Sequence, residues 1–154
     1  MAYVSLDSAQ IKRANKKHKY TKEQVLQLEK CMDPKTGPLF FMENFMKIQH
    51  PTKGEMPFQP YPYQKRLIEA YNSHRFSISM LPRQTGKTTC ASGYLIWYAM
   101  FHPDSSILIA AHKYAGASDI MSRVRYAYEM LPSWIKAGVT QYNRNSIEFD
   151  NGSK

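Results

Sequence analysis

The chain has 154 residues, a formal net charge of +9 at pH 7 and a pI near 9.5. A chain of this length can bury roughly two thirds of its unfolded surface, so one domain with an appendage is expected. The excess positive charge favours an anionic partner, and nucleotides, nucleic acids and acidic membranes all qualify. The longest apolar run, residues 94–101, is far too short to cross a bilayer and predicts a buried helix.

Much of the positive charge lies in one basic run near the start of the chain. Its members are Lys12, Arg13, Lys16, Lys17, Lys19 and Lys22. Such runs are usually solvated tails, and the alternative is contact with a nucleic acid.

The two cysteines, Cys31 and Cys90, lie at no metal-ligand spacing from another Cys or His. No secretory signal precedes them. We therefore expect two unpaired thiols in a reducing intracellular setting, and no zinc site.

A capping box, Thr21-Lys-Glu-Gln24, opens the first expected helix. Apolar residues at helical spacing then share one face: Val25, Leu28 and Met32. The sequence Asp33-Pro-Lys-Thr-Gly-Pro38 predicts the end of this helix.

A second helix is expected over residues 39–48, with its apolar stripe in the core rather than in a ligand site. Residues 50–62 are rich in Pro and Gly and predict a linker or an extended arm. We place a boundary there. Residues 1–52 would form the basic tail and a helical appendage, and residues 53–154 the main domain.

The most informative feature is a strand pattern joined to a Gly-Lys-Thr turn and then to a long helix. A helix is expected over residues 63–73, and residues 76–81 alternate apolar side chains with serine, as a strand does. Residues 81–88 (Leu-Pro-Arg-Gln-Thr-Gly-Lys-Thr) follow, and residues 89–101 predict a helix. Backbone N–H groups of such a turn bind phosphate oxygens, and the positive helix N-terminus favours the same charge. Residues 81–88, named the phosphate loop, are therefore expected to bind a nucleotide.

Each residue type in the phosphate loop suits a triphosphate. Lys87 is expected on the β and γ phosphates, and the Thr88 hydroxyl on Mg²⁺. The Arg83 guanidinium is expected to place its positive charge and planar set of N–H donors beside the γ phosphate. Leu81 replaces the usual first glycine, and Pro82 has no N–H to donate. The alternative is a proline-led turn with solvated Arg and Lys side chains.

A second motif, Tyr61-Pro-Tyr-Gln64, lies upstream of the phosphate loop. Glutamine offers a donor and an acceptor that match the N6 and N7 edge of adenine, so Gln64 is expected to select ATP over GTP. Tyr61 and Tyr63 offer flat faces on which a base could stack. The alternative is that Gln64 is a surface helix residue and that the tyrosines only pack.

The rest of the chain predicts one more strand, one helix and a hairpin. Residues 107–111 are apolar throughout, as in a parallel strand covered on both faces. Residues 115–131 predict a helix that Pro132 ends. Residues 139–142 and 146–149 predict a hairpin with an Asn-Arg-Asn turn. The expected fold class is therefore α/β, with a mostly parallel sheet flanked by helices.

Hydrolysis of a nucleotide needs one carboxylate for Mg²⁺ and a second to polarise water, after another buried strand. The only candidate is Asp150, which precedes Asn151 rather than a glutamate. Glu148 faces the other way, so the pattern fits an exposed hairpin better than a catalytic strand. We therefore expect the chain to be a part of a larger enzyme.

Three motifs together resemble the ATPase domain of large terminase subunits of tailed bacteriophages, of the T4-like type. They are Leu81-Pro-Arg-Gln-Thr-Gly-Lys-Thr-Thr89, Ile107-Leu-Ile-Ala-Ala-His-Lys113 and Ser146-Ile-Glu-Phe-Asp-Asn-Gly-Ser153. The resemblance covers the chain from about Phe58 onward. It implies a P-loop NTPase fold of the RecA-like, ASCE class, incomplete at the C-terminus. It also implies a motor that couples ATP hydrolysis to the movement of double-stranded DNA into a procapsid.

The resemblance implies residue roles as well. Lys87 and Arg83 would act in catalysis, and Thr88 would bind Mg²⁺. Contacts to ATP are implied for Gln64, Gln84, Thr85, Gly86, Lys87, Thr88 and Thr89. The implied partners are double-stranded DNA, the portal protein, the small terminase subunit and further copies in a ring, with no membrane. The implied location is the host cytoplasm and, transiently, the procapsid portal.

Two alternatives remain open from the sequence. One is a superfamily 2 helicase-like ATPase, which shares the upstream glutamine and the sheet. The other is a non-catalytic nucleotide or nucleic-acid binding module, which would explain the missing acids and the basic start. Because the acidic strand and the family's nuclease have no counterpart, the chain alone is expected to be inactive.

Overall fold

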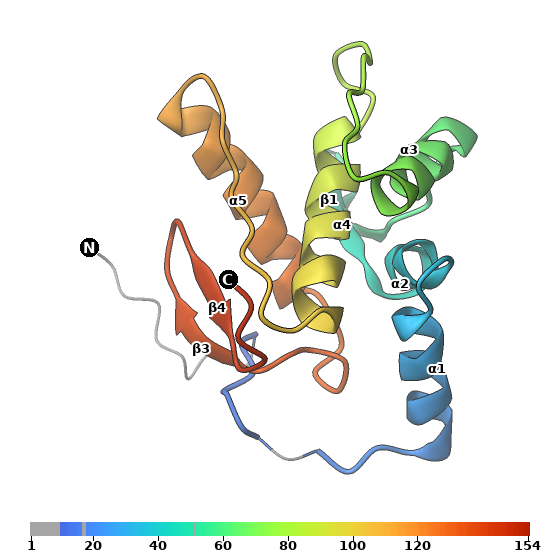
Figure 1. Ribbon diagram of the computed structural model, residues 1–154, viewed down its shortest axis with the longest axis vertical. Coiled ribbons are helices and arrows are strands. Elements are labelled where there is room, and N and C mark those ends of the chain that lie inside the picture. The colour runs from blue at the N-terminus through green and yellow to red at the C-terminus, as the bar shows by residue number, and fades with distance from the viewer. Residues whose placement is uncertain (1–9, 17, 51) are drawn as a thin grey trace.

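The computed structural model describes residues 10–16, 18–50 and 52–154, and this part of the chain has an α/β fold. Its elements in chain order are α1 (Lys22–Met32), α2 (Gly37–Phe45), β1 (Lys47–His50), β2 (Gly54–Pro57), α3 (Pro62–Ser73), α4 (Lys87–Phe101), α5 (Tyr114–Glu129), β3 (Val139–Tyr142) and β4 (Ile147–Phe149). Figure 1 shows α4 near the centre, and it contacts α2, α3 and α5. The segment between α3 and α4, which contains the phosphate loop, projects at one end of the molecule.

The expected capping box is confirmed at the start of α1. The backbone N–H of Gln24 donates to the Thr21 hydroxyl at 3.2 Å, and the Thr21 N–H donates to the Gln24 side chain at 3.0 Å. These two bonds satisfy donors that a helix start otherwise leaves unpaired. The second helix is also present as α2, which begins earlier than expected, at Gly37. It also ends earlier, at Phe45, because Met46 takes an extended conformation.

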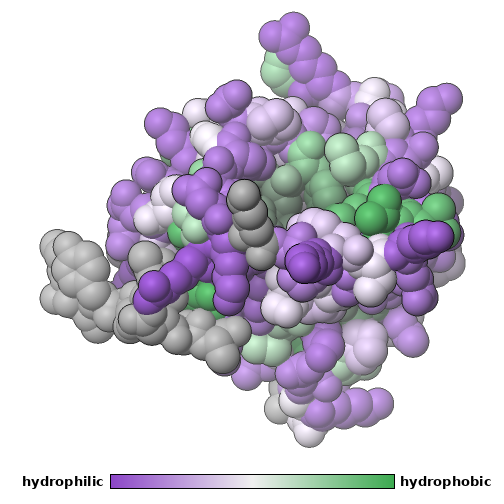
Figure 2. Space-filling view, turned by 90° about the horizontal axis from the view of Figure 1, so that it is seen from below, coloured by the Kyte–Doolittle hydropathy of each residue, from purple (hydrophilic) through white to green (hydrophobic). Residues whose placement is uncertain are grey.

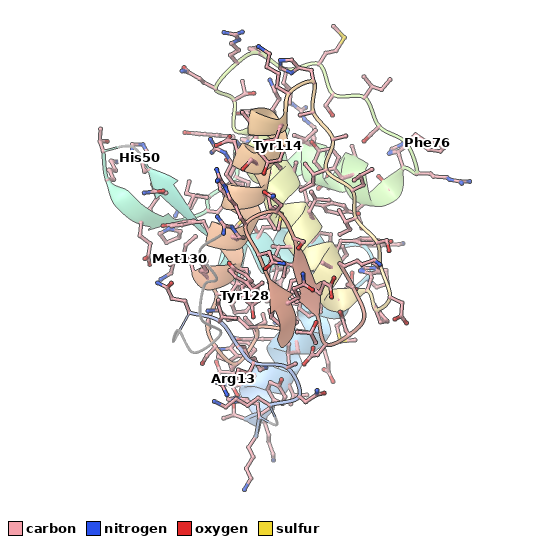
Figure 3. The ribbon with its side chains drawn as sticks, turned by 90° about the vertical axis from the view of Figure 1, so that its left-hand side faces the viewer. Arg13, His50, Phe76, Tyr114, Tyr128 and Met130 are labelled. Carbon is pink, nitrogen blue, oxygen red and sulfur yellow. The ribbon has the colours of Figure 1, made fainter. Side chains whose placement is uncertain are left out.

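The segment predicted as a linker is partly wrong, because it contains an antiparallel hairpin. β1 pairs with β2, and Ile48 lies opposite Met56. Gly54 has a φ of +72°, a left-handed value that favours glycine, at the start of β2. Figure 3 shows His50 at the outer end of this hairpin, away from the helices. The boundary predicted between residues 52 and 53 falls in the turn and stays a prediction.

The two predicted parallel strands, residues 76–81 and 107–111, are not strands in the structure. A strand exists only through hydrogen bonds to a neighbour, and among the described residues the strands pair as β1 with β2 and β3 with β4, with no pairing of these two segments to either sheet. The prediction of a mostly parallel sheet is therefore wrong for this part of the chain. The unpaired segments leave large apolar side chains in solvent: Phe76 is 83%, Ile78 96% and Leu108 90% exposed.

One trace of parallel pairing is present beside the second segment. The N–H of Lys154 donates to the carbonyl of Ser105 at 2.8 Å, and the N–H of Ile107 donates to the carbonyl of Lys154 at 2.7 Å. In a parallel pair, one residue of a strand bonds to two residues, i and i+2, of the neighbouring strand, as Lys154 does with Ser105 and Ile107. A cavity of about 570 Å³ lies between this segment, α4, α5 and β4, with a mainly apolar lining that includes Ile96 and Met121.

The C-terminal hairpin is confirmed: β3 pairs with β4 in antiparallel register. The N-terminal arm lies beside it, because Arg13 forms an isolated parallel bridge with Val139. The Lys12 ammonium donates to the carbonyl of Lys136 at 2.7 Å. The prediction of a solvated basic tail is therefore wrong for Lys12, and Lys17 lies outside the described residues.

A buried lysine holds the same arm in place. Lys136 is 4% exposed, and its ammonium donates to the carbonyls of Gln10 and Glu129 at 2.6 and 2.8 Å. Burial lowers the pKa of Lys136, and the nearby Glu129 carboxylate opposes that shift. These carbonyl oxygens satisfy the charge that burial would otherwise leave uncompensated.

One hydrophobic core extends from α2 to β4. Its largest fully buried side chains include Trp97, Tyr128, Phe41, Met42, Ile68 and Ile96. Both cysteines are buried and unpaired, as expected. Within the described ranges, no helix is both long and apolar enough to span a membrane. The face shown in Figure 2 is mainly hydrophilic, with apolar side chains gathered over one part of it.

Candidate nucleotide site

The first turn of α4 opens directly from the phosphate loop. Its N-cap residue is Gly86, with a φ of 75° and a ψ of 13°, and no side chain caps the helix. Gln84 is also left-handed, with a φ of 62°. Left-handed residues in a tight turn direct neighbouring N–H groups into one concavity, which is a form that binds anions. The uncapped N-terminus of α4 adds its partial positive charge at the same place.

Lys87, the first residue of α4, turns back across the loop. Its ammonium donates to the carbonyls of Leu81 and Pro82 at 3.2 and 3.3 Å. The Thr85 hydroxyl donates to the Pro82 carbonyl at 3.0 Å. The loop is therefore a closed turn with a lysine ammonium at its mouth. Between Ala70 and Pro103 the sequence has no Asp or Glu, so no carboxylate of this stretch opposes an anion.

The N-terminal turn of α3 holds the loop from the other side. The Tyr63 hydroxyl donates to the Thr85 carbonyl at 2.9 Å, and Nε2 of Gln64 donates to the same oxygen at 3.0 Å. Oε1 of Gln64 accepts the N–H of Tyr61 at 2.9 Å. Gln64 is only 5% exposed. The surface-residue alternative for Gln64 is therefore wrong: its amide is a buried link between α3 and the loop.

Gly86 is required by this contact. A Cβ at this position would lie 2.5 Å from Nε2 of Gln64, and the left-handed φ would strain any L side chain. Beside it, the rings of Tyr61 and Tyr63 are stacked at 5.8 Å with an interplanar angle of 8°. Tyr61 is 64% exposed, so one flat aromatic face lies open next to the loop.

The remaining predicted contact residues lie at different places around the loop. Arg83 and Gln84 are exposed, and Thr88 is half-buried in the first turn of α4. Thr89 lines a separate polar cavity of about 440 Å³ between α4, α5 and β1. Outside this set, His112 and Lys113 end the motif that begins at Ile107, and both are exposed just before α5.

Asp150 lies at the opposite end of α4 from the phosphate loop. Its carboxylate accepts the N–H of Asn15 at 3.1 Å. The next side chain, Asn151, donates to the carbonyls of Ala99 and Met100 in the last turn of α4, at 2.9 and 3.2 Å. Because α4 has 15 residues, about 20 Å separates its two ends. The hairpin interpretation of Asp150 is thus confirmed, and this carboxylate cannot reach a metal ion at Thr88.

The comparison with known families bears directly on this loop. The family model described as "Terminase large subunit, T4likevirus-type, N-terminal" matches residues 78–154, which is half of the chain. The chain belongs to the T4-like large terminase subunits. The match includes the phosphate loop, α4, α5 and the β3–β4 hairpin, whereas α1, α2 and α3 lie before it.

Membership of this terminase family confirms the resemblance seen in the sequence and suggests a role in packaging DNA. Large terminase subunits are in general ATPases that act with a portal protein and a small terminase subunit.

Sequence reasoning missed the hydroxyl of Tyr63, which it considered only as a flat face for a base. The available signal was position: Pro62 begins α3, so Tyr63 and Gln64 share its first turn and can reach one target. It also missed Asn151, whose amide satisfies carbonyls at the end of α4.

Proposed function

We propose that the phosphate loop of this terminase chain binds the triphosphate of ATP. The observation that carries the proposal is the uncapped start of α4, where left-handed Gly86 precedes a lysine that turns into the loop. The loop N–H groups and the Lys87 ammonium would hold the β and γ phosphates, and Arg83 would turn in from its exposed position to the γ phosphate. Gln84, Thr85 and Thr89 would complete the contacts.

The residues present fit a magnesium–nucleotide complex. The Thr88 hydroxyl would hold Mg²⁺, which would supply positive charge to the phosphate oxygens. A glutamine amide can donate two hydrogen bonds and accept two, so beyond its two observed bonds Gln64 would use its second N–H and second lone pair for the N7 and N6 edge of adenine. The exposed face of Tyr61 could stack on the base.

The finer fold proposal is a P-loop sheet. Residues 76–81 and 107–111 would become parallel strands when further strands of a large terminase subunit pair with them. The two Lys154 bonds to Ser105 and Ile107 support this, as do the exposed apolar side chains of both segments. We expect amide exchange at Ile78 and Leu108 to be slow in a longer terminase polypeptide and fast in this chain. Fast exchange in both polypeptides would rule out the parallel sheet.

In packaging, ATP binding and hydrolysis would drive the movement of double-stranded DNA, held through its phosphates without base reading. The portal protein, the small subunit and further copies in a ring would be the partners. The place of action would be the host cytoplasm at the procapsid portal. This coupling rests on the terminase family and on the phosphate loop together.

The test is ATP binding by calorimetry in the presence of Mg²⁺. Wild-type chain should bind, Lys87→Ala should lose at least tenfold in affinity, and Lys35→Ala should bind as wild type. Lys35 is a suitable charge-matched control because it is exposed in the turn between α1 and α2. Equal binding by the Lys87 and Lys35 variants would defeat the proposal.

Turnover decides between a hydrolysing and a purely binding role. The binding-module alternative is favoured by Asp150, which lies at the far end of α4. We expect this chain to bind ATP without steady turnover, with or without duplex DNA. Turnover abolished by Lys87→Ala would exclude the binding-module alternative for this chain.

A further inference from the structure

The Thr85 carbonyl receives two side-chain donors from consecutive residues of α3. The Tyr63 hydroxyl lies 2.9 Å from this oxygen and Nε2 of Gln64 lies 3.0 Å from it. A carbonyl oxygen has two lone pairs, so both of its acceptor positions are occupied. Neither donor bonds any other residue of the loop, and the contact crosses more than twenty residues of sequence.

Two bonds to one carbonyl fix the orientation of a whole peptide unit. The described chain has no cis peptide bonds, and in a trans peptide the C=O and the following N–H point in opposite directions. With the Thr85 oxygen held toward α3, the Gly86 N–H must point away from α3. Gly86 is the N-cap of α4, so its N–H lies at the start of the helix, where an anion is favoured.

We propose that Tyr63 is a positioning residue of the phosphate loop: its hydroxyl, together with Gln64, turns the Thr85–Gly86 peptide so that the Gly86 N–H faces the bound triphosphate. This inference rests on the proposed function, because it requires the loop to bind a triphosphate. The inference gives the Tyr63 hydroxyl a role of its own, because stacking on a base would need only the ring.

The geometry separates this role from base stacking. The ring of Tyr63 is stacked on Tyr61, and the Tyr61 side chain is the more exposed of the two. Removing the Tyr63 hydroxyl leaves its ring, and hence the stack, in place. An effect of Tyr63→Phe must therefore come through the Thr85 carbonyl and the loop, and it must not depend on whether the ligand carries a base.

The experiment compares Mg·ATP with inorganic tripolyphosphate plus Mg²⁺, which has no base, by calorimetry on the full chain. Tyr63→Phe should weaken both probes by a similar factor, roughly three- to tenfold, as expected for one neutral hydrogen bond. The matched control is Tyr20→Phe, because Tyr20 is 43% exposed in the segment before α1 and has no part in the site, and this variant should stay within about twofold of wild type for both probes. Amide exchange at Gly86 should be faster in Tyr63→Phe than in Tyr20→Phe.

Each other outcome has a definite meaning. If wild type binds both probes and Tyr63→Phe binds them equally well, the positioning role is overturned and the proposed function stands. If Tyr63→Phe loses ATP alone, Tyr63 acts on the base and the inference is wrong. If wild type binds neither probe, the proposed function fails and the inference fails with it.

Discussion

The indole nitrogen of Trp97 donates to the backbone carbonyl of Cys31 at 2.8 Å, and this bond joins the end of α1 to the middle of α4. Trp97 is 1% exposed. The helix that begins at the phosphate loop is therefore bonded to the helix predicted to belong to an N-terminal appendage. Unfolding of the two is expected to be coupled.

Trp97→Phe should lower the free energy of unfolding by about 2–4 kcal/mol, because it deletes buried atoms and leaves the Cys31 carbonyl unpaired. Loss of ellipticity should remain a single transition. Trp134→Phe is the matched control: it deletes the same atoms from a half-buried ring for which no such bond is found, and should cost about 1 kcal/mol. Equal losses for the two variants would show that the bond to Cys31 contributes nothing.

Gly86→Ala is expected to abolish ATP binding, because its Cβ would displace the Gln64 amide that holds Thr85. The left-handed φ adds a loss of about 1–2 kcal/mol in stability. Gly54→Ala provides the control, since Gly54 has a φ of +72° and no atom within 4 Å of a new Cβ. That variant should show only the loss of stability due to the left-handed φ, together with normal ATP binding. Normal binding by Gly86→Ala would contradict the site.

Gln64→Ala separates two roles of one side chain when it is titrated with Mg·ATP, Mg·GTP and tripolyphosphate. Loss of its bond to Thr85 should weaken all three ligands by roughly three- to tenfold. Loss of adenine recognition should weaken ATP by a further factor of about ten relative to GTP. If ATP and GTP lose equally, Gln64 does not read the base and acts on the loop alone.

Both thiols should resist modification in the folded chain. Burial raises the pKa of Cys31 to about 12 and that of Cys90 to about 11, from an ordinary value of 9.0. At pH 8 roughly one Cys90 in a thousand is a thiolate, against about one in ten at the ordinary pKa. Ellman's reagent should therefore detect almost no thiol in native protein and both thiols in guanidinium. Rapid native reaction would contradict the observed burial.

The same shifts predict how stability depends on pH. The folded state keeps its thiol protons to a higher pH than the unfolded state, so above pH 8.5 the unfolded state binds fewer protons. Stability should therefore fall as pH rises from 8.5 to 9.5, and buried tyrosines such as Tyr128, whose pKa is also raised from 10.0, add to the decline at the upper end of this range. Cys90→Ala should lower overall stability but make this decline less steep. An unchanged slope would assign the decline to other groups.

Local signals in the sequence were sufficient for most helices and for the C-terminal hairpin. The Thr21 capping box, the Gly86 turn into α4 and the Asn-Arg-Asn turn before β4 each depend on a few neighbouring residues, and each forms as expected. Such features are decided by short-range hydrogen bonds and backbone preferences.

The failures share a different cause. Alternation in residues 76–81 describes a side-chain pattern, whereas a strand also needs a neighbour, and the described residues supply none. The β1–β2 hairpin could not be distinguished from a linker in the sequence, because Pro and Gly are frequent in hairpin turns and in linkers alike. Local position puts Tyr63 beside Gln64 in the first turn of α3, but its bond to Thr85 also depends on how α3 docks against the loop, which a local pattern does not give.

The exposed row of Phe76, Ile78 and Met80 has a practical consequence for anyone who purifies this polypeptide. An extended segment with unpaired backbone groups and exposed apolar side chains can pair with the same segment of another copy. The chain should therefore oligomerise or precipitate as its concentration rises. Light scattering against concentration would reveal it, and replacing these three side chains with threonine should keep the preparation monodisperse.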